Sequence, residues 1–468
     1  MKKFFLTTFL FFTFIFGDTL ILNYQKACSL AVENCLLKKI SEEKVKKRYF
    51  ERLTSLANFF PSLNLSFAYS HLSEVPYFLS GKPILGKYPF PVYDIFGNLI
   101  GFTESIPVIT GYQTESIPFG KKDNYLFRVS LNQPIFTFFK ILRGYKIAQL
   151  NELIEKENYW LTLNNLKKQV INLFYQILLL KKQKELLLAS YEQLKKHHLA
   201  CSTLYRAGLL TKLELLKTQL ALEGLEINLT QAIQNESLLL FNFQLLLGLK
   251  DKDEVVLIDP LVEKWEKEEL VLRKIEENLD TLLAIAEKER RELKTLVLTK
   301  EIIKNTIHIQ KSSFLPNIIS SYNYDYKKPY SFFDDKWKGS GTFTIALNLP
   351  LSLGGGEYTK LKSLEHQLKE VDFYYQWSKE LIKNEVKQVY FKYLTTFDNF
   401  NYTFNRVKVA KEALKEAEEG FKLGKVSNLE YLDTELKLRE AKLANLKSLL
   451  ENLITKKELE YAIGKGID

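Results

Sequence analysis

Two stretches of this chain nearly repeat each other: G-L-L-T-K-L-E-L-L begins at Gly208, and G-K-V-S-N-L-E-Y-L begins at Gly424. Both fit the pattern G-x-x-[S/T]-x-x-E-x-L, and the offset between them is 424 − 208 = 216. The same offset links Pro134 with Pro350, each closing an L-N-x-P motif, and Gly248 with Gly464. Three pairs of landmarks at one offset indicate an internal duplication. Duplication of so long a unit is typical of a repetitive scaffold rather than of a single catalytic pocket.

Each repeated stretch predicts a tight helical hairpin. Its glycine suits the left-handed backbone conformation that ends a helix. The threonine or serine three residues later can cap the next helix, and the glutamate three residues further on completes a capping box. The expected hairpin caps are therefore Gly208, Thr211 and Glu214 in the first half, and Gly424, Ser427 and Glu430 in the second.

The helices that meet at these turns are expected to be very long. No proline or glycine occurs from Glu357 to Glu419, and only Gly144 interrupts the run from Phe138 to about Cys201. Each run of about 63 residues would form a helix about 95 Å long, well beyond the usual length. Shorter helical segments are expected at Tyr24–Asn58, Thr211–Leu247, Leu279–Ser313 and Ser427–Ile463.

Four other segments alternate between apolar and polar residues. Period-two alternation over about ten residues predicts strands with one apolar and one polar face, as in transmembrane barrels. A soluble sheet lying on a helix is the alternative interpretation. The four segments are Ser62–Ser70, Asn124–Asn132, Asn317–Tyr326 and Thr342–Leu351.

Four such strands cannot close a barrel alone, and an open sheet edge is not tolerated in lipid. Single-chain barrels begin at eight strands. If the strands face lipid, the chain must therefore oligomerise, and three copies would supply twelve strands.

The N-terminus has the pattern of a cleaved export signal. Lys2 and Lys3 precede an apolar run from Phe4 to Phe16, and Gly17 offers a small residue at a cleavage point. The run is too short to span a bilayer as a helix. We expect residues 1–17 to be a signal peptide, with an uncleaved anchor as the alternative.

The formal net charge is +10 and falls to +10 − 2 = +8 after removal of that segment. The charges are interspersed along the helical runs, which is typical of solvated faces, and the export signal also argues against a nucleic-acid partner. Cys28 and Cys35 would lie about 10 Å apart on one helix, too far for a disulfide. The adjacent His197 and His198 would point in different directions, so no metal site is expected.

Motifs of catalysis are missing from the sequence. It contains no G-x-S-x-G, no H-E-x-x-H and no Walker-type phosphate loop. We therefore expect no enzymatic activity and no cofactor, and we expect function to reside in shape.

Taken together, these features resemble the TolC family of outer-membrane efflux and secretion channels. The resemblance covers nearly the whole chain after the signal segment. Besides the duplicated turns, it rests on L-I-L-N-Y-Q-K-A-C-S-L-A-V-E-N-C at Leu20–Cys35, F-F-P-S-L-N-L-S at Phe59–Ser66, F-L-P-N-I-I-S-S at Phe314–Ser321, the corners at Pro134 and Pro350, and the Leu247-Gly248 and Ile463-Gly464 pairs.

The resemblance implies a mixed α and β fold: a homotrimer that forms a 12-stranded transmembrane β-barrel, continued by a long periplasmic α-helical barrel. It implies a passive export duct of a tripartite efflux pump or type I secretion system in the cell outer membrane. The partners would be a periplasmic adaptor protein, an inner-membrane transporter and outer-membrane lipid. The expected divisions are a first repeat at 18–249 with a strand hairpin at 62–136, an equatorial linker at 250–278, and a second repeat at 279–468 with a strand hairpin at 316–351.

The chain departs from the family pattern in its first strand hairpin. The sequence numbers of Pro61 and Pro134 differ by 73, whereas those of Pro316 and Pro350 differ by 34, an excess of 73 − 34 = 39. We expect the enclosed segment, His71–Asp123, to be a surface loop outside the cell, with a cap over the pore as the sharper alternative.

The resemblance also assigns a periplasmic aperture near the second turn. Glu430 and Asp433 match the family's acidic ring, which would attract cations, and crowding of like charges there should raise some of their pKa values. Family members latch this end partly with a Tyr and an Arg, but the matching residues here are Phe421 and Val426. We therefore expect closure to depend on apolar contacts.

A second class of function stays open on the sequence alone. The chain could be a structural periplasmic helical protein or adaptor with no membrane barrel. The four alternating segments favour the channel, because a structural protein has no need of strands long enough to cross a lipid bilayer.

Overall fold

The computed structural model of the chain describes residues 20–249, 255–267, 269–332, 334–350 and 354–466. The signal peptide expected at 1–17 and the end of the last expected strand at Leu351 lie outside these residues. The chain divides into two compact units, and each takes segments from both halves of the sequence. One unit is Arg52–Ile147 with Asn305–Leu364, and it contains the strand hairpins; the other contains the two helical turns.

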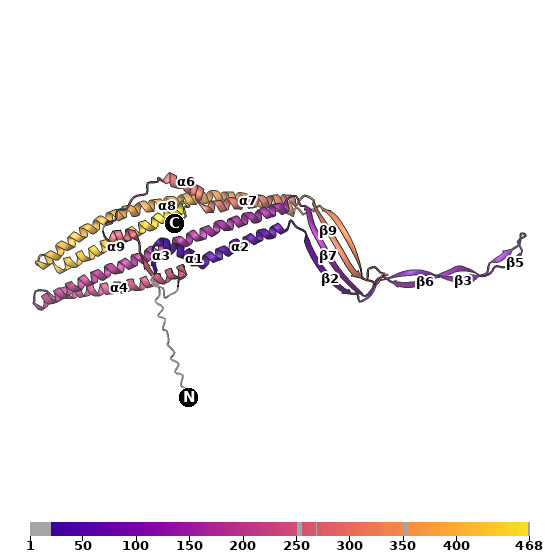
Figure 1. Cartoon of the computed structure of the whole chain (residues 1–468), viewed down its shortest axis with the longest axis horizontal. Helices are drawn as coiled ribbons and strands as arrows, with labels where there is room; N and C mark the ends of the chain where they lie inside the picture. Colours follow the sequence, from indigo (N-terminus) through magenta and orange to yellow (C-terminus); the bar gives the residue numbers. More distant parts are fainter. Residues whose placement is uncertain (1–19, 250–254, 268, 333, 351–353, 467–468) are drawn as a thin grey trace, which may run out of the picture. The chain divides into compact units, whose positions relative to one another are not determined.

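The duplicated turns join four long helices into two helical hairpins (Figure 1). Helix α3 (Lys140–Arg206) and helix α8 (Gly356–Lys422) each contain 67 residues, and both their starts and their ends differ by 216. Helix α4 (Lys212–Leu247) and helix α9 (Asn428–Ala462) return from the turns. The expected long helices are thus present. No helix in the described part of the chain is both long and apolar enough to cross a membrane.

The two shorter helical segments are each broken once, where the sequence predicted continuous helices. The first consists of α1 (Tyr24–Asn34) and α2 (Leu36–Ala57), and the second of α6 (Leu279–Glu289) and α7 (Arg291–Ser312). Cys35 and Arg290 occupy the breaks in extended conformations, with ψ of 132° and 121°. Their sequence numbers differ by 290 − 35 = 255, which equals the repeat offset plus the excess of the first strand hairpin, 216 + 39.

The junction between the two halves is a small mixed layer. Strand β1 (Leu20–Leu22) pairs in parallel with β8 (Val255–Leu257), and α5 (Pro260–Glu266) follows with Asp259 as its cap. The Asp259 carboxylate also accepts a hydrogen bond from the Tyr175 hydroxyl at 3.1 Å. The residues around this junction belong to a core that includes Phe174, Phe243 and Leu449.

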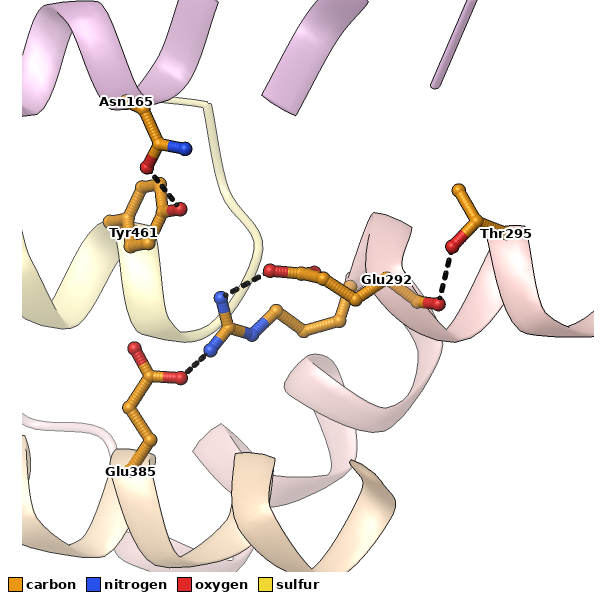
Figure 2. A network of polar contacts seen from close by, with 6 residues as sticks. Asn165, Glu292, Thr295, Glu385 and Tyr461 are labelled. Carbon is orange, nitrogen blue, oxygen red and sulfur yellow. Dashed lines mark hydrogen bonds and ion pairs between the residues drawn. The ribbon is translucent and has the colours of Figure 1, made fainter. Parts of the chain in front are cut away.

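A polar network holds α9 to its surroundings at the end away from the turn (Figure 2). The Arg290 side chain is 5% exposed and donates to Glu292 at 3.1 Å and to Glu385 of α8. Its guanidinium carbon lies 5.6 Å from the ring centre of Tyr461, whose hydroxyl bonds the side-chain oxygen of Asn165 on α3 at 2.8 Å. The break before α7 therefore brings a cation to the point where α8 and α9 meet.

Four antiparallel strands form one sheet in the order β10-β9-β7-β2, with β2 (Ser62–His71), β7 (Asp123–Phe136), β9 (Asn317–Lys328) and β10 (Lys338–Asn348). Leu65 pairs with Val129, and Val129 with Tyr324, so the apolar residues of adjacent strands share one face. On the opposite face, Arg128 pairs with Asp325 through two bonds of 2.6 and 2.7 Å. The alternating segments therefore assemble with their expected faces in register.

The outer strands of this sheet are open. Among the described strands, β2 has only β7 as a neighbour, and β10 has only β9. Each therefore presents a row of backbone donors and acceptors that its own sheet leaves without strand partners.

The two residues expected at the barrel corners, Pro134 and Pro350, lie near the ends of strands β7 and β10. Strand β7 continues through Pro134 to Phe136, with a shift of register between these residues, and the chain turns at Phe138 and Phe139, whose φ angles are 47° and 64°. Proline is tolerated there because an irregular register removes the need for a backbone N–H, which proline lacks. Strand β10 ends at Asn348, two residues before Pro350.

The segment expected to be a surface loop at His71–Asp123 is instead largely β-structure. Strand β3 (Tyr77–Tyr88) pairs with β6 (Ile106–Pro118), and β4 (Pro91–Tyr93) pairs with β5 (Leu99–Phe102). The ribbon was missed because prolines, glycines and a bulge after Ile84 interrupt the alternation of apolar and polar residues.

Candidate functional site at the helical turns

Both turns carry the local structure that their sequences favour. Gly208 and Gly424 have φ of 75° and 70°, a region that favours glycine. Thr211 caps α4 and Ser427 caps α9, and each forms a reciprocal capping box with the glutamate three residues later. In the second turn the Ser427 amide donates to the Glu430 carboxylate at 2.8 Å. The backbone groups at both turns are thus bonded locally, which fixes where the two hairpins end.

A cluster of polar and aromatic side chains joins the two hairpins just behind these turns. It consists of Gln193, His197 and Cys201 from α3 and Asn428 and Tyr431 from α9, and we call it the turn cluster. His197 Nε2 lies 2.6 Å from Asn428 Oδ1, and the His197 ring stacks on Tyr431 with centres 4.1 Å apart. The Gln193 amide donates to the Tyr431 hydroxyl at 3.3 Å.

The partners of Asn428 fix the direction of the central hydrogen bond. Asn428 donates through Nδ2 to the backbone carbonyl of Glu214 at 3.2 Å, so its Oδ1 faces His197 and Cys201. His197 Nε2 therefore carries the hydrogen and donates. One side chain of the second hairpin thereby bonds both helices of the first, α3 and α4.

Burial governs the charge of the histidine. His197 is buried, and desolvation lowers its pKa below the usual value, with a smaller contribution in the same direction from His198. The hydrogen bond to Asn428 and the carboxylate of Glu418 act in the opposite sense but do not overcome burial. His197 is therefore neutral in this arrangement at neutral pH.

Phe421 and Val426 lie beside the turn cluster. The Phe421 ring is centred 4.8 Å from that of His197 and 6.0 Å from that of Tyr431. Val426 packs so closely against Gly420 that a Cβ atom at Gly420 would clash with Val426 Cγ2. Both residues line a groove of about 880 Å³ between the two turns, together with His197, Leu209 and Tyr431. The expected apolar residues are thus adjacent to a polar contact that no sequence pattern predicted.

The two expected aperture carboxylates are exposed in one chain. Glu430 serves the capping box, and hydrogen bonds from the Ser427 backbone and hydroxyl hold its pKa below the usual range. Asp433 pairs with Lys437 one turn along α9. The expected rise in pKa requires several copies, whose like charges would lie close together. Within one chain, the contacts of Glu430 lower its pKa.

One feature of the sequence could have indicated the turn cluster. Gln193, His197 and Cys201 recur every four residues on α3, so they share one helical face. The neighbouring His198 instead bonds Thr218 through Nδ1 at 3.0 Å. Among the described residues no three His, Cys, Asp or Glu side chains gather as metal ligands would.

Comparison with solved structures shows the same fold. The chain resembles the outer membrane protein VceC of Vibrio cholerae, with a TM-score of 0.71 and 15% identity over 95% of this chain and 97% of that one. The outer membrane channel CmeC of Campylobacter jejuni has a TM-score of 0.73 and 13% identity over 95% and 86% of the two chains. The open state of the Neisseria gonorrhoeae channel MtrE gives 0.70 and 13%, over 95% and 89%.

Sequence comparison agrees with the fold. No curated protein sequence matches the chain. The profile of a family described as outer membrane efflux protein matches residues 110–238 and 282–465, which is 129 + 184 = 313 of 468 residues. This match agrees with the duplicated helical hairpins and with the four-stranded sheet, whose apolar and polar residues lie on opposite faces. The chain therefore belongs to the outer membrane efflux protein family.

Proposed function

We propose that three copies of this chain assemble into a passive export duct, with a 12-stranded barrel in the outer membrane and a helical barrel in the periplasm. The observation that carries the proposal is the four-stranded sheet. One of its faces is apolar, and its outer strands β2 and β10 have open edges. Pairing β2 of one copy with β10 of the next removes every open edge, which a lipid environment requires.

The polar face of the sheet would then line the duct. Asn64, Ser130 and Thr344 lie on that face, and the Arg128–Asp325 pair crosses it. Such a surface stays wetted, so polar solutes can pass without binding. The apolar face, with Leu65, would contact lipid.

The helical turns would form the periplasmic end of the duct. There, Glu430 and Asp433 would set the charge of the aperture, while Phe421 and Val426 would narrow it. A periplasmic adaptor protein docked by an inner-membrane transporter would open this end. The repeat divisions at 18–249 and 279–468, joined by the linker at 250–278, fit this plan because each repeat would supply one strand hairpin and one helical hairpin.

Mass measurement and conductance together test the proposal. Detergent-extracted protein should have the mass of three chains, and it should form ion-conducting pores in planar bilayers. The other candidate, a structural periplasmic protein, would be a stable detergent-free monomer without conductance, and that result would overturn the duct.

A further inference from the structure

Another cavity, of about 310 Å³, lies between α3, α5, α8 and α9. Its floor is apolar, because Trp265 and Phe404 line it and both also pack against the main buried core. Four lysines and two glutamates stand around it, with a formal net charge of 4 − 2 = +2: Lys182, Lys408, Lys411, Lys442, Glu185 and Glu266. The cavity therefore joins an apolar floor to a basic rim.

Helix α5 supplies one wall of this cavity and is fixed at both ends. At its start, its cap residue accepts the hydrogen bond from Tyr175 of α3. At its end, Trp265 donates through Nε1 to Asn445 Oδ1 at 2.7 Å. The next residue, Glu266, pairs with Lys182 of α3 at 2.5 Å. The cavity is thus formed before any ligand arrives, which lowers the cost of binding.

Asn445 of α9 sets the orientation of the Trp265 ring. It is 1% exposed, and its amide donates to the Phe400 carbonyl at 3.2 Å and to the Thr403 hydroxyl at 3.0 Å. Those two partners use Nδ2, so Oδ1 is left to accept from Trp265. Since Nε1 is the one polar atom of an indole and is already bonded, Trp265 offers a ligand only its apolar ring.

The two carboxylates beside the cavity are engaged by Lys182. Its ammonium group bonds Glu185 at 2.8 Å and Glu266 at 2.5 Å. Burial by itself would lower the pKa of Lys182, but the hydrogen bonds to both carboxylates outweigh burial and raise that pKa. Both acids are therefore held by a lysine that stays charged at neutral pH.

The other three lysines place positive charge beside the aromatic rings. Lys408, Lys411 and Lys442 line the cavity from α8 and α9. Lys408 Nζ lies 4.8 Å from the centre of the Phe404 ring. An acid group at the rim can bond to ammonium groups while an apolar body rests on the rings below.

The duplication shows that this basic character belongs to one place in the chain. The counterparts of Lys182, Lys408 and Lys442, 216 positions away, are Asp398, Glu192 and Glu226. Three of the four lysines thus correspond to acids in the other repeat. The positive charge is therefore not a general property of the repeated helices.

We propose that this cavity binds a small aromatic acid, a molecule with one or two fused rings and one anionic group. The rings of Trp265 and Phe404 would contact its apolar body, and Lys408 and Lys442 would bond its acid group. The volume of about 310 Å³ is at the lower end for small-molecule sites, which limits the ligand to this size. Lysine offers a point charge rather than the planar fork of arginine, so a single carboxylate or sulfonate suits it.

Such a ligand would touch both repeats and the linker between them. Helix α3 belongs to the first half of the chain, α8 and α9 belong to the second, and α5 lies between them. Binding would stabilise the folded chain as the ligand concentration rises. All of these elements belong to one chain, so the site needs no assembly of three copies.

Binding of naphthoate, a two-ring aromatic carboxylate, to the full-length chain in non-ionic detergent tests the proposal. Isothermal titration calorimetry measures the dissociation constant, and the midpoint of thermal unfolding is a second readout. The test variant is Lys408→Gln with Lys442→Gln. Its matched control, Lys415→Gln with Lys447→Gln, makes the same change on the same two helices at lysines outside the cavity lining.

Naphthoate should bind the unsubstituted chain and the control equally, and should raise the unfolding midpoint of both. Its affinity for the test variant should be lower by about tenfold, because charged hydrogen bonds are lost. The charge-reversed probe naphthylmethylammonium should bind the unsubstituted chain more weakly than naphthoate does. Trp265→Leu should also weaken naphthoate binding, whereas Trp377→Leu, at an exposed tryptophan of α8, should not.

Three results would overturn the proposal: no saturable binding of naphthoate, equal affinities of the two probes, or equal affinities of the test variants and their controls. Equal affinities of the probes would mean that apolar partitioning alone holds them. None of these results bears on the duct, whose mass and conductance are measured without the probe.

Discussion

Gly464 lies directly against the backbone of Arg290: a Cβ atom on Gly464 would stand 3.0 Å from the Arg290 amide nitrogen. The first half repeats this contact, because a Cβ atom on Gly248 would stand 3.0 Å from the Cβ of Asn34, one residue before the break at Cys35. Both glycines have positive φ, 79° and 67°. In each half, therefore, the end of the returning helix fits against the break in the shorter helical segment.

This contact predicts that Gly464→Ala destabilises the protein. Alanine would be strained at positive φ by roughly 1–2 kcal/mol, and its Cβ would also press on backbone that cannot move aside as a side chain can. The midpoint of thermal unfolding, followed by circular dichroism, should fall. Gly466→Ala is the matched control, since its Cβ would meet nothing within 4 Å. Equal midpoints for the two variants would contradict the prediction.

The turn cluster predicts that Asn428→Ala loosens the contact between the hairpins. The variant would leave the buried His197 Nε2–H without its acceptor and would remove the bond to the Glu214 carbonyl, at a cost of roughly 1–3 kcal/mol. The duct should then spend a larger fraction of time open, measured as single-channel open probability. Lys212→Ala changes the exposed counterpart, 428 − 216 = 212, and should behave as the unsubstituted chain. An unchanged open probability for Asn428→Ala would show that the cluster does not restrain the turns.

Burial of His197 makes the same contact sensitive to acid. Its pKa is lowered in the closed arrangement and would return toward about 6.5 once the turns separate into water. Neutral His197 thus stabilises the closed form fully when the pH is above the ordinary histidine pKa. This stabilisation is lost as the pH falls below that pKa. The charged and titratable groups around the ring are His198, Glu418, Cys201 and Tyr431. The last two stay neutral in this range, since burial raises the pKa of each.

Open probability should therefore rise when the bath is acidified from about pH 7.5 to about pH 5.5, on either side of the ordinary histidine pKa. His197→Gln keeps a donor for Asn428 but cannot titrate, so its response should be much smaller. If both proteins respond equally to acid, another group is responsible.

Several elements could be predicted from the sequence because they depend on local rules. The two turns follow from glycine, cap and glutamate spacing, and the sheet faces follow from period-two alternation, which pairing in register preserves. Helix α3 extends to Arg206, close to the predicted limit, because nothing between Gly144 and Gly208 disfavours a helix.

Other elements depend on contacts between distant parts of the chain. The breaks at Cys35 and Arg290 involve neither proline nor glycine at those positions, and the glycine that meets the second break, Gly464, comes from the far end of the second repeat. The bond between His197 and Asn428 joins residues 231 positions apart, and no local pattern predicts it. Strands β3 and β6 could not be predicted from the alternation of apolar and polar residues, because prolines and glycines interrupt it. The two strands nevertheless pair, since backbone pairing tolerates those residues.

The segregated sheet faces predict opposite responses to charge at adjacent residues. Val129→Lys would place a cation on the apolar face, at a cost of about 2–4 kcal/mol if that face lies in mid-membrane. Ser130→Lys would place it on the polar face and should cost little. The yield of folded trimer in the outer membrane, measured by heat-modifiable migration on gels, should fall only for Val129→Lys. Similar losses for both variants would mean that the face assignment is wrong.

The carboxylates of Glu430 and Asp433 should set the cation preference of the periplasmic end. Both are exposed within one chain, and the ion pair of Asp433 with Lys437 is weak at an exposed site. Three copies would bring six carboxylates to the aperture, which favours cations and binds multivalent ones. Glu430→Gln retains a side-chain acceptor for the Ser427 amide and so keeps the capping box largely intact.

The decisive variant combines Glu430→Gln with Asp433→Asn, because both side chains keep their size and lose their charge. In planar bilayers it should lose cation selectivity and block by multivalent cations, while its mass in detergent stays unchanged. Glu214→Gln is the control, since it makes the same chemical change in the other capping box, 430 − 216 = 214. Retained selectivity and block in the double variant would place these carboxylates away from the conducting path.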